Sequence, residues 1–251
     1  MRSTLGSDLS HDAFLGGRVH LWQPRGGYRA GVDPVLLAAS VDAHAGQAVL
    51  DLGCGVGAVA LCLGARVPGL TLLGVEREAE YAALAARNGL EVVEADLQAL
   101  PEAVKARGFD HVLANPPYYD RGAGHAARDP AREAALGEVT PLAVWIDVAT
   151  RRLRPKGYLH MIHKADRVPD LMRAVDARLG SLELIPICPR IGKPAELVIF
   201  RARKEGRAPF RLHAPVILHA GMRHERDGED YTPEIQAVLR EGAALLQTAR
   251  H

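Results

Sequence analysis

Four consecutive residues, Asn115-Pro116-Pro117-Tyr118, have the types needed to hold a planar group that carries an amine. An exocyclic amine conjugated to a ring is a weak nucleophile, and two acceptors that take its hydrogens draw electron density onto the nitrogen. The side-chain oxygen of Asn115 and the carbonyl of Pro116 can be those acceptors, because the prolines fix the backbone and aim the carbonyl. Tyr118 offers a face on which a base can stack. We therefore predict these four residues to be catalytic in N-alkylation, with positioning supplying most of the rate.

A glycine-rich segment before them predicts a cofactor site. The segment from Asp51 to Gly57, DLGCGVG, lies at a strand-to-helix turn, where glycines let the backbone approach a ligand and the helix offers free N–H groups. Gly53, Gly55 and Ala58 also fit a dinucleotide pattern. The carboxylate of Asp51, two residues before the first glycine, favours S-adenosylmethionine (SAM), whose amino-acid end carries a cation, over a pyrophosphate.

Two further acids end the next two predicted strands. Glu76 lies 19 residues after Gly57, where an acid can accept both hydroxyls of a ribose. Asp96 ends the third strand and is placed to meet the adenine amine of the cofactor. Each acid alone could be a helix cap or a solvated carboxylate. Three acids at three consecutive strand ends of one sheet indicate a ligand-binding edge.

Alternating strand and helix patterns must position these residues. Seven runs predict strands: Ala48–Gly53, Thr71–Glu76, Glu91–Asp96, Phe109–Ala114, Tyr158–His163, Leu182–Ile187 and Glu196–Arg201. Helical stretches separate most of them, which implies right-handed βαβ units and a mainly parallel sheet. The last two runs have no helix between them and should form a hairpin. Helix starts are predicted at Asp33-Pro34, Thr140-Pro141 and Thr232-Pro233, each an N-cap followed by proline.

This α/β pattern, a Rossmann-like sheet of seven strands that is mostly parallel with one antiparallel strand in a terminal hairpin, resembles the class I SAM-dependent methyltransferases. We expect one compact domain in three parts. Residues 1–47 form an N-terminal extension packed over the cofactor site, residues 48–204 form the methyltransferase core, and residues 205–251 form a C-terminal extension.

Four motifs along the chain narrow the resemblance. The segments RGGYRAGVDPVLLAAS (25–40), DLGCGVG, NPPYY and DYTPE (230–234) resemble the bacterial tRNA (adenine-N6)-methyltransferases, which modify the purine immediately 3′ of the anticodon in a valine tRNA. The resemblance implies SAM as the cofactor, tRNA as the partner and a cytoplasmic location. It assigns the target base to residues 115–118. It assigns the wall of the cofactor pocket to Arg29, Gly31, Asp33, Asp51, Gly53, Gly55, Glu76, Asp96, Leu97 and Asn115.

Basic residues in two segments predict the RNA contacts. The long stretch between Tyr119 and Thr140 is predicted to be a partly helical lid, because long loops beside active sites are usually functional. Its expected substrate contacts are Tyr119, Arg121, Arg128 and Arg132. The densest basic patch spans residues 201–211 and contains Arg201, Arg203, Lys204, Arg207 and Arg211. We expect this patch on the RNA backbone, with a solvated strand edge as the alternative.

Composition excludes several classes of protein. The 251 residues are 48% hydrophobic and 24% charged, which is ordinary globular composition and excludes disordered and coiled-coil chains. The net charge of +1 does not indicate a nucleic-acid partner, but residues 1–100 are net acidic and residues 101–251 net basic, which places any polyanion on the second part. Three cysteines without a CxxC pair predict reduced, buried thiols. We expect no membrane segment and no structural metal.

Other functions remain open on these residues. Protein-glutamine methyltransferases of the release-factor type, guanine-N2 enzymes acting on ribosomal RNA and DNA adenine enzymes share the NPPY chemistry, although the first usually carry a longer N-terminal domain. An inactive RNA-binding protein on the SAM fold is disfavoured by the three intact acids. An NAD dehydrogenase leaves the NPPYY run unexplained. The sequence does not determine the oligomeric state.

Overall fold

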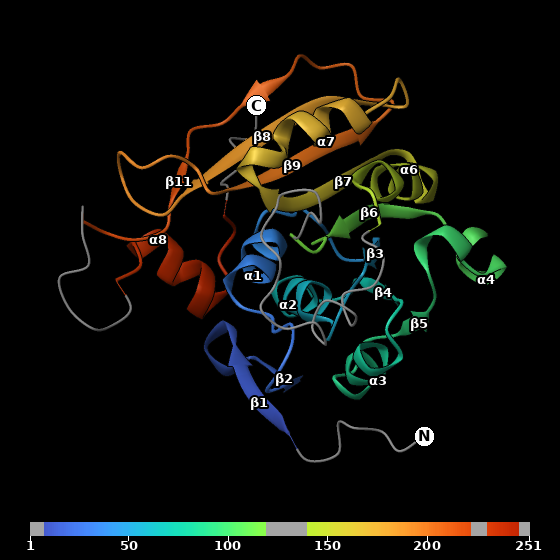
Figure 1. The fold of residues 1–251 in the computed structure, drawn as a ribbon, viewed down its shortest axis with the longest axis horizontal. Coiled ribbons are helices and arrows are strands. Elements are labelled where there is room, and N and C mark those ends of the chain that lie inside the picture. The colour runs from blue at the N-terminus through green and yellow to red at the C-terminus, as the bar shows by residue number, and fades with distance from the viewer. Residues whose placement is uncertain (1–7, 119–139, 222–229, 246–251) are drawn as a thin grey trace, which may run out of the picture.

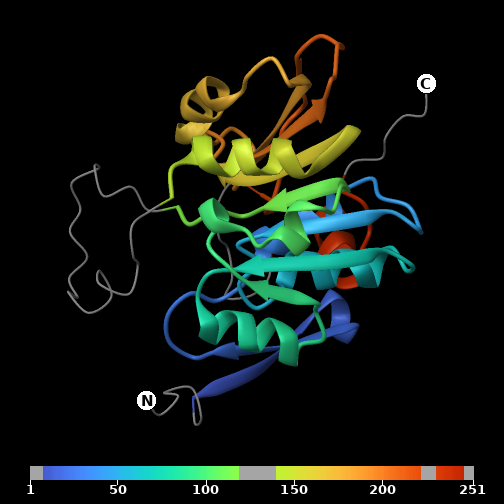
Figure 2. The ribbon, with the colours of Figure 1, turned by 90° about the vertical axis from the view of Figure 1, so that its right-hand side faces the viewer.

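A mixed β-sheet forms the centre of the protein (Figure 1). The computed structural model describes residues 8–118, 140–221 and 230–245. The strands of this sheet are β3 (Ala48–Leu52), β4 (Thr71–Glu76), β5 (Val92–Glu94), β6 (Phe109–Ala114), β7 (Leu153–Lys164), β8 (Leu179–Cys188), β9 (Leu197–Lys204), β10 (Arg211–Leu212) and β11 (Val216–Ile217). Their order is β10-β8-β9-β7-β6-β3-β4-β5, with β11 also paired to β8. Figure 2 shows this order running from the top of the view to the bottom.

The sheet confirms the fold predicted from the sequence. All seven predicted strands are present as β3 to β9, and the pairs β3–β4, β4–β5, β3–β6 and β6–β7 are parallel. Strand β9 is antiparallel to both of its neighbours, β7 and β8. This agrees with the predicted hairpin, because no helix separates β8 from β9 in the sequence. The short strands β10 and β11 extend the sheet beyond β8.

Helices cover both faces of the sheet, and the alternation of side chains along the strands explains why. In β3, Leu50 and Leu52 point into one apolar core while Val49 points into the other. The first core is closed by α4 (Glu102–Lys105), α6 (Leu142–Arg152) and α7 (Val168–Ala174). The second is closed by α1 (Val32–Ala39), α2 (Ala58–Arg66) and α8 (Pro233–Gln236). Helix α3 (Ala79–Arg87) packs beside α2.

An N-terminal hairpin was not predicted. Strands β1 (Leu9–Phe14) and β2 (Val19–Pro24) pair antiparallel in a separate two-stranded sheet, visible in dark blue at one end of the molecule in Figure 2. The sequences of these two strands show little alternation of apolar and polar residues. Rings of histidine and tryptophan make contacts between the strands: His11 stacks on Trp22 with ring centroids 4.4 Å apart.

The three predicted helix starts have different outcomes. The Thr232 side chain accepts a hydrogen bond from the Ile235 N–H, which confirms it as the N-cap of α8. The helical turns after α8 end at Gly242, at φ +67°. The other two are wrong in detail, because α1 begins at Val32, which puts Asp33 inside the first turn, and α6 begins after Pro141 without a side-chain cap.

A pair of buried histidines makes the free energy of unfolding depend on pH. His111 and His160, 3% and 0% exposed, lie on β6 and β7 with Nδ1 and Nε2 3.1 Å apart. Burial lowers the pKa of His111 to about 4, and Asp110 and Arg201 act on it in opposite directions. The unfolded pKa of histidine is about 6.5, so the unfolded chain binds more protons between these two values. The stability present above pH 6.5 is therefore lost as pH falls toward 4.

We expect His111 to contribute a loss of about 2 kcal/mol in the free energy of unfolding between pH 7.5 and pH 5. Urea denaturation at the two pH values measures the loss. His111→Asn keeps a polar atom at the position of Nδ1 without a titrating ring, so the difference between the two pH values should shrink. The same replacement at exposed His20 of β2 is the control. A pH dependence that is identical in wild type and His111→Asn would contradict the assignment.

Candidate active site

The parallel register brings the predicted site residues to one edge of the sheet. Leu52 of β3 is level with Val75 of β4 and with Ala114 of β6. The residues that follow these three positions therefore share the carboxyl edge, where ligands bind in open α/β sheets. Glu76 and Asn115 are two of these residues, and Asp51 lies one residue before Leu52, so the three are brought toward the same edge although they are far apart in the sequence.

The turn after β3 depends on glycine for two reasons. Gly53 and Gly55 have φ values of +62° and +55°, in the left-handed region. A Cβ atom on Gly53 would lie 2.4 Å from Cη2 of Trp145, a side chain of α6. The N–H of Cys54 donates to the Val75 carbonyl at 3.0 Å and fastens the turn to β4. The backbone consequently stays close to the pocket described below, with no side chain at Gly53 to fill it.

Asp51 is a buried carboxylate with an unused acceptor. It is 1% exposed, and its Oδ2 accepts a hydrogen bond of 3.2 Å from the Ala60 N–H at the start of α2. Its Oδ1 has no hydrogen-bond partner among the described residues. Burial raises the pKa of Asp51 to about 7. A buried acceptor without a partner is costly, so this oxygen fits a ligand that brings a cationic donor, such as the ammonium group of SAM.

The Glu76 carboxylate accepts hydrogen bonds from the backbone of two loops at the carboxyl edge of the sheet. One carboxylate oxygen accepts from the Gly55 N–H at 2.9 Å, and the other accepts from the N–H groups of Arg77 and Glu78 at 2.8 and 2.9 Å. The side chain is half-buried at the end of β4. A carboxylate has about four lone-pair sites, so these three contacts leave acceptor capacity for a hydroxyl group.

Asp96 and Leu97 have structural roles. The Asp96 carboxylate caps the short helical turn Leu97–Ala99 by accepting from the Gln98 N–H at 2.7 Å. The Leu97 side chain packs into the core formed with α6. Leu97 can therefore meet a cofactor only through its main chain, whereas Asp96 lies at the edge with its carboxylate partly exposed.

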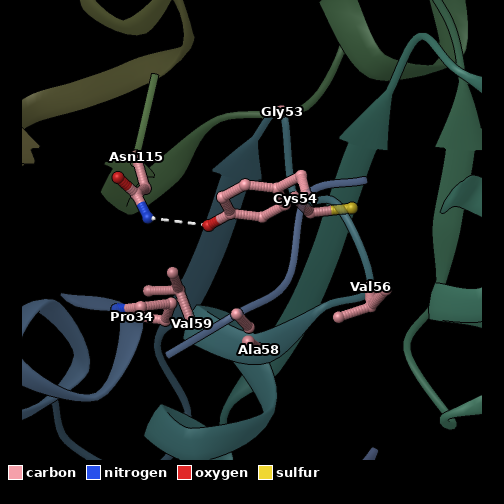
Figure 3. Close-up of a pocket in the computed structure, with 9 residues that line it drawn as sticks. Pro34, Gly53, Cys54, Val56, Ala58, Val59 and Asn115 are labelled. Carbon is pink, nitrogen blue, oxygen red and sulfur yellow. Dashed lines mark hydrogen bonds between the residues drawn. The ribbon is translucent and has the colours of Figure 1, made fainter. Parts of the chain in front are cut away.

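Two hydrogen bonds connect the N-terminal segment with the residues after β6. The Asn115 Nδ2 group donates to the Tyr28 hydroxyl at 3.2 Å, drawn as the dashed line in Figure 3. The Tyr118 hydroxyl donates to Asp33 Oδ2 at 2.7 Å. The Tyr118 ring also lies edge-on to His163, with centroids 5.3 Å apart. The Asp33 carboxylate, which was expected to cap α1, instead holds a residue of the NPPY run.

The pocket at this edge contains residues that were not predicted. It is lined by Tyr28, Ala30, Pro34, Gly53, Cys54, Val56, Ala58, Val59 and Asn115 (Figure 3). Tyr28 is the most informative addition, and the signal for it was an aromatic residue between glycines in RGGYRAG. Arg29, by contrast, pairs with Asp12 of the hairpin at 2.7 Å. Gly31 precedes α1 with open space where a Cβ would stand.

The expected RNA contacts divide into three groups. Tyr119, Arg121, Arg128 and Arg132 lie outside the described residues. The expected RNA contacts at Arg201 and Lys204 are corrected by the structure, because both side chains bind groups of the protein itself. Arg201 is 9% exposed and lies 3.5 Å from Glu183, while the Lys204 ammonium donates to the carbonyls of Thr150 and Leu153 at the end of α6.

The remainder of the basic patch faces solvent to different degrees. Arg203 is half-buried, with Nε donating to the Lys156 carbonyl and its guanidinium 5.3 Å from the Tyr158 ring centre. Arg207 and Arg211 are exposed beside Phe210, whose exposed fraction is 51%. Among the described residues, no group of histidine, cysteine and acidic side chains could hold a metal ion. Over the same residues, no helix has the length and apolar character needed to span a membrane.

Comparison with known proteins finds similarity to methyltransferases, both in sequence and in structure. The profile of the methyltransferase small domain family matches residues 30–183. A tRNA1(Val) (adenine(37)-N6)-methyltransferase from Actinobacillus succinogenes is 29% identical over 75% of this chain and 82% of that protein. A release factor glutamine methyltransferase from Salmonella typhimurium is 30% identical over 53% of this chain and 51% of its own. A solved structure described as a predicted O-methyltransferase, from Agrobacterium tumefaciens, superposes with a TM-score of 0.67 at 28% identity, over 84% of this chain and 97% of that one.

Proposed function

The chain belongs to the methyltransferase small domain family, whose members use SAM, and we propose that this SAM-dependent methyltransferase modifies the exocyclic N6 amine of an adenine in tRNA. The purine immediately 3′ of the anticodon of a valine tRNA is the proposed target. The observation that carries the proposal is the position of Asn115 in the pocket wall, directly after β6 and beside the glycine turn.

The residues of the edge suit the parts of the cofactor. Asp51 would hold the ammonium group of the cofactor, the backbone at Gly53 and Gly55 its methionine part, Glu76 its ribose and Asp96 its adenine amine. The unpartnered buried oxygen of Asp51 supports this fit. When bound, SAM supplies a methyl group on a sulfonium that is already activated as a leaving group.

The chain's own contribution to the reaction is to hold the target base. Asn115 Oδ1 and the Pro116 carbonyl accept the two amine hydrogens, which turns the nitrogen lone pair toward the methyl group. Tyr118 supplies the stacking face, and the base reaches it after leaving its own stack. Holding the base in place supplies most of the rate. The nitrogen becomes positively charged when it bonds to the methyl group and then releases one proton to solvent, so a strong general base is not required.

Adenine in tRNA is proposed over the other NPPY substrates on two grounds. Several relatives that match most of this chain are named as enzymes acting on adenine 37 of a valine tRNA, whereas the glutamine methyltransferase matches only about half of it. The exposed Arg207 and Arg211 add positive charge beside Phe210. Phosphates attract such cations, and an exposed ring can stack on a base. A tRNA substrate also implies activity in the cytoplasm.

Nucleoside mass spectrometry tests the function. The full chain is incubated with SAM and an unmodified valine tRNA transcript, and the digested nucleosides are analysed for N6-methyladenosine. A transcript with guanine in place of the target adenine is the matched control and should remain unmethylated. Methylation of a release factor, of DNA adenine or of guanine N2 in place of tRNA adenine would agree with the role proposed for the NPPY residues and would contradict the proposed substrate.

Salt dependence tests the exposed arginines. We expect the double variant Arg207→Gln, Arg211→Gln to weaken tRNA binding and to reduce the slope of log K against log salt by about one for each phosphate contact removed. Fluorescence anisotropy with labelled tRNA over a series of salt concentrations measures the slope. Arg107→Gln, at the opposite end of β6 from Asn115, is the control and should leave the slope unchanged. An unchanged slope in the double variant would assign these arginines to a solvated edge.

A further inference from the structure

Tyr28 is held firmly beside the pocket by its own backbone. Its N–H donates to the Tyr81 hydroxyl of α3 at 3.0 Å, and the same hydroxyl donates to the Tyr28 carbonyl at 3.1 Å. The ring passes over the glycine turn, since a Cβ on Gly55 would stand 3.7 Å from Tyr28 Cε1. Both backbone groups of Tyr28 are therefore anchored on α3, which fixes where its side chain can reach.

The side chain reaches the amide of Asn115. The distance from Asn115 Nδ2 to the Tyr28 hydroxyl oxygen is 3.2 Å. Although 52% of Tyr28 is exposed to solvent, the packing around its phenol and the carboxylates of Asp33 and Asp51 raise its pKa. The phenol is thus neutral across the working pH range. The hydroxyl oxygen of Tyr28 is the acceptor in its contact with the Asn115 amide.

An asparagine amide has two orientations that occupy the same space. In one, the oxygen faces the ligand and can accept from an amine; in the other, the NH₂ group faces it and repels the amine hydrogens. A partner that accepts from Nδ2 on the far side favours the first orientation, and it does so before a ligand binds. Among the described hydrogen bonds, the Tyr28 hydroxyl is that partner.

We propose that Tyr28 is a positioning residue, whose hydroxyl holds the Nδ2 group of Asn115 so that Oδ1 faces the amine to be methylated. This inference rests on the proposed function only in requiring an amine or amide target. It applies equally to adenine, guanine and glutamine. Tyr28 acts through Asn115 and need not touch the reacting nitrogen.

The chain offers a direct view of this hydrogen bond, because it contains two asparagines, Asn88 and Asn115. Selective labelling of asparagine with ¹⁵N therefore yields two side-chain NH₂ groups in an NMR spectrum. We expect Tyr28→Phe to shift the Asn115 signals and to speed the exchange of their hydrogens with water. Asn88, whose Nδ2 donates to the Trp22 and Val56 carbonyls, is the internal control. Unchanged Asn115 signals in Tyr28→Phe would overturn the proposal.

A double-mutant cycle tests the consequence for catalysis. Tyr28→Phe keeps the ring over the glycine turn and removes only the hydroxyl, so we expect single-turnover methyl transfer to slow by about fivefold to tenfold, the loss for one hydrogen bond. The Kd for SAM and the KM for the nucleic acid should stay within about twofold. In an Asn115→Asp background both oxygens accept and no wrong orientation exists. There the same substitution should cost less than about twofold.

The outcomes separate this proposal from the function it rests on. Equal losses from Tyr28→Phe in the wild-type and Asn115→Asp backgrounds, or a loss expressed in SAM affinity with the turnover rate unchanged, would make Tyr28 a pocket wall and overturn the positioning role. Faster turnover in Tyr28→Phe would make the hydroxyl an obstruction and would also overturn it. If the tRNA transcript proves not to be the substrate, the proposed function fails, and the NMR measurement still decides the role of Tyr28.

Discussion

Asn115→Ala should lower kcat for methyl transfer to tRNA by about 10²–10³-fold, the usual cost of removing one positioned polar group from an active site. In the proposed mechanism, Asn115 Oδ1 accepts one hydrogen of the target amine, and without it the nitrogen lone pair turns away from the methyl group. The base is also held by Tyr118, so the affinity for tRNA should change little. Single-turnover transfer with saturating tRNA measures the rate, and fluorescence anisotropy with labelled tRNA measures the affinity.

Asn115→Asp is the matched control for this substitution. It has the same shape, presents two acceptor oxygens where asparagine has one, adds a negative charge, and removes the Nδ2 donor that contacts Tyr28. We expect it to retain substantially more turnover than the alanine variant. Near wild-type turnover in Asn115→Ala would show that other groups activate the nitrogen and that the role given to this residue is wrong.

The second large effect is expected at Gly53. Alanine there would hold a left-handed φ of +62° and place its Cβ 2.4 Å from Trp145 Cη2. The backbone conformation costs about 1–2 kcal/mol, and crowding a packed core costs about 1–3 kcal/mol more. We expect Gly53→Ala to reduce the free energy of unfolding by about 2–5 kcal/mol, measured by urea denaturation, and to weaken SAM binding because the turn must shift.

Two variants separate these causes. Gly55→Ala has a similar φ of +55°, but its Cβ would meet Tyr28 at an ordinary contact distance of 3.7 Å. It should therefore show only the backbone cost. Trp145→Phe removes the outer ring atoms that Gly53→Ala meets, so the added alanine should cost less in that background than in wild type. If Gly53→Ala in wild type, Gly55→Ala in wild type and Gly53→Ala in the Trp145→Phe background all lowered the free energy of unfolding equally, the contact with Trp145 would not be the reason that position 53 requires glycine.

Local patterns were sufficient for strands β3 to β9 and for the turns that follow them, although not for the β1–β2 hairpin or for the starts of α1 and α6. The alternation that divides Val49 from Leu50 between two cores is a property of strands themselves, and β3 to β9 were therefore predictable. The glycine turn and the NPPY run lie directly after strands β3 and β6, so their place at the carboxyl edge followed once those strands were recognised as parallel. Short-range geometry sets all of these features.

The environment of each charged side chain was not predictable in the same way. Arg201 and Arg203 alternate along β9 in a dense basic run, yet Arg201 is buried against Glu183 of β8, and Lys204 binds carbonyls at the end of α6. A run of basic residues in the sequence indicates that a region of the chain has a positive electrostatic potential. Which members of the run face solvent depends on the strand paired beside them and the helix packed above.

The sequence by itself determined the fold class, the carboxyl edge as the site, and the types of residue there. Only the tertiary structure decided which residues act on one another across the site. Tyr28 meets Asn115 and Asp33 meets Tyr118 across 87 and 85 residues of sequence. Spacing carries no information about such pairs, because the distance between them is set by how α1 and the segment before it pack against the sheet. Strand and helix periodicity acts over a few residues, whereas the hydrogen bond between the Asn115 amide and the Tyr28 hydroxyl joins two segments that only folding brings together.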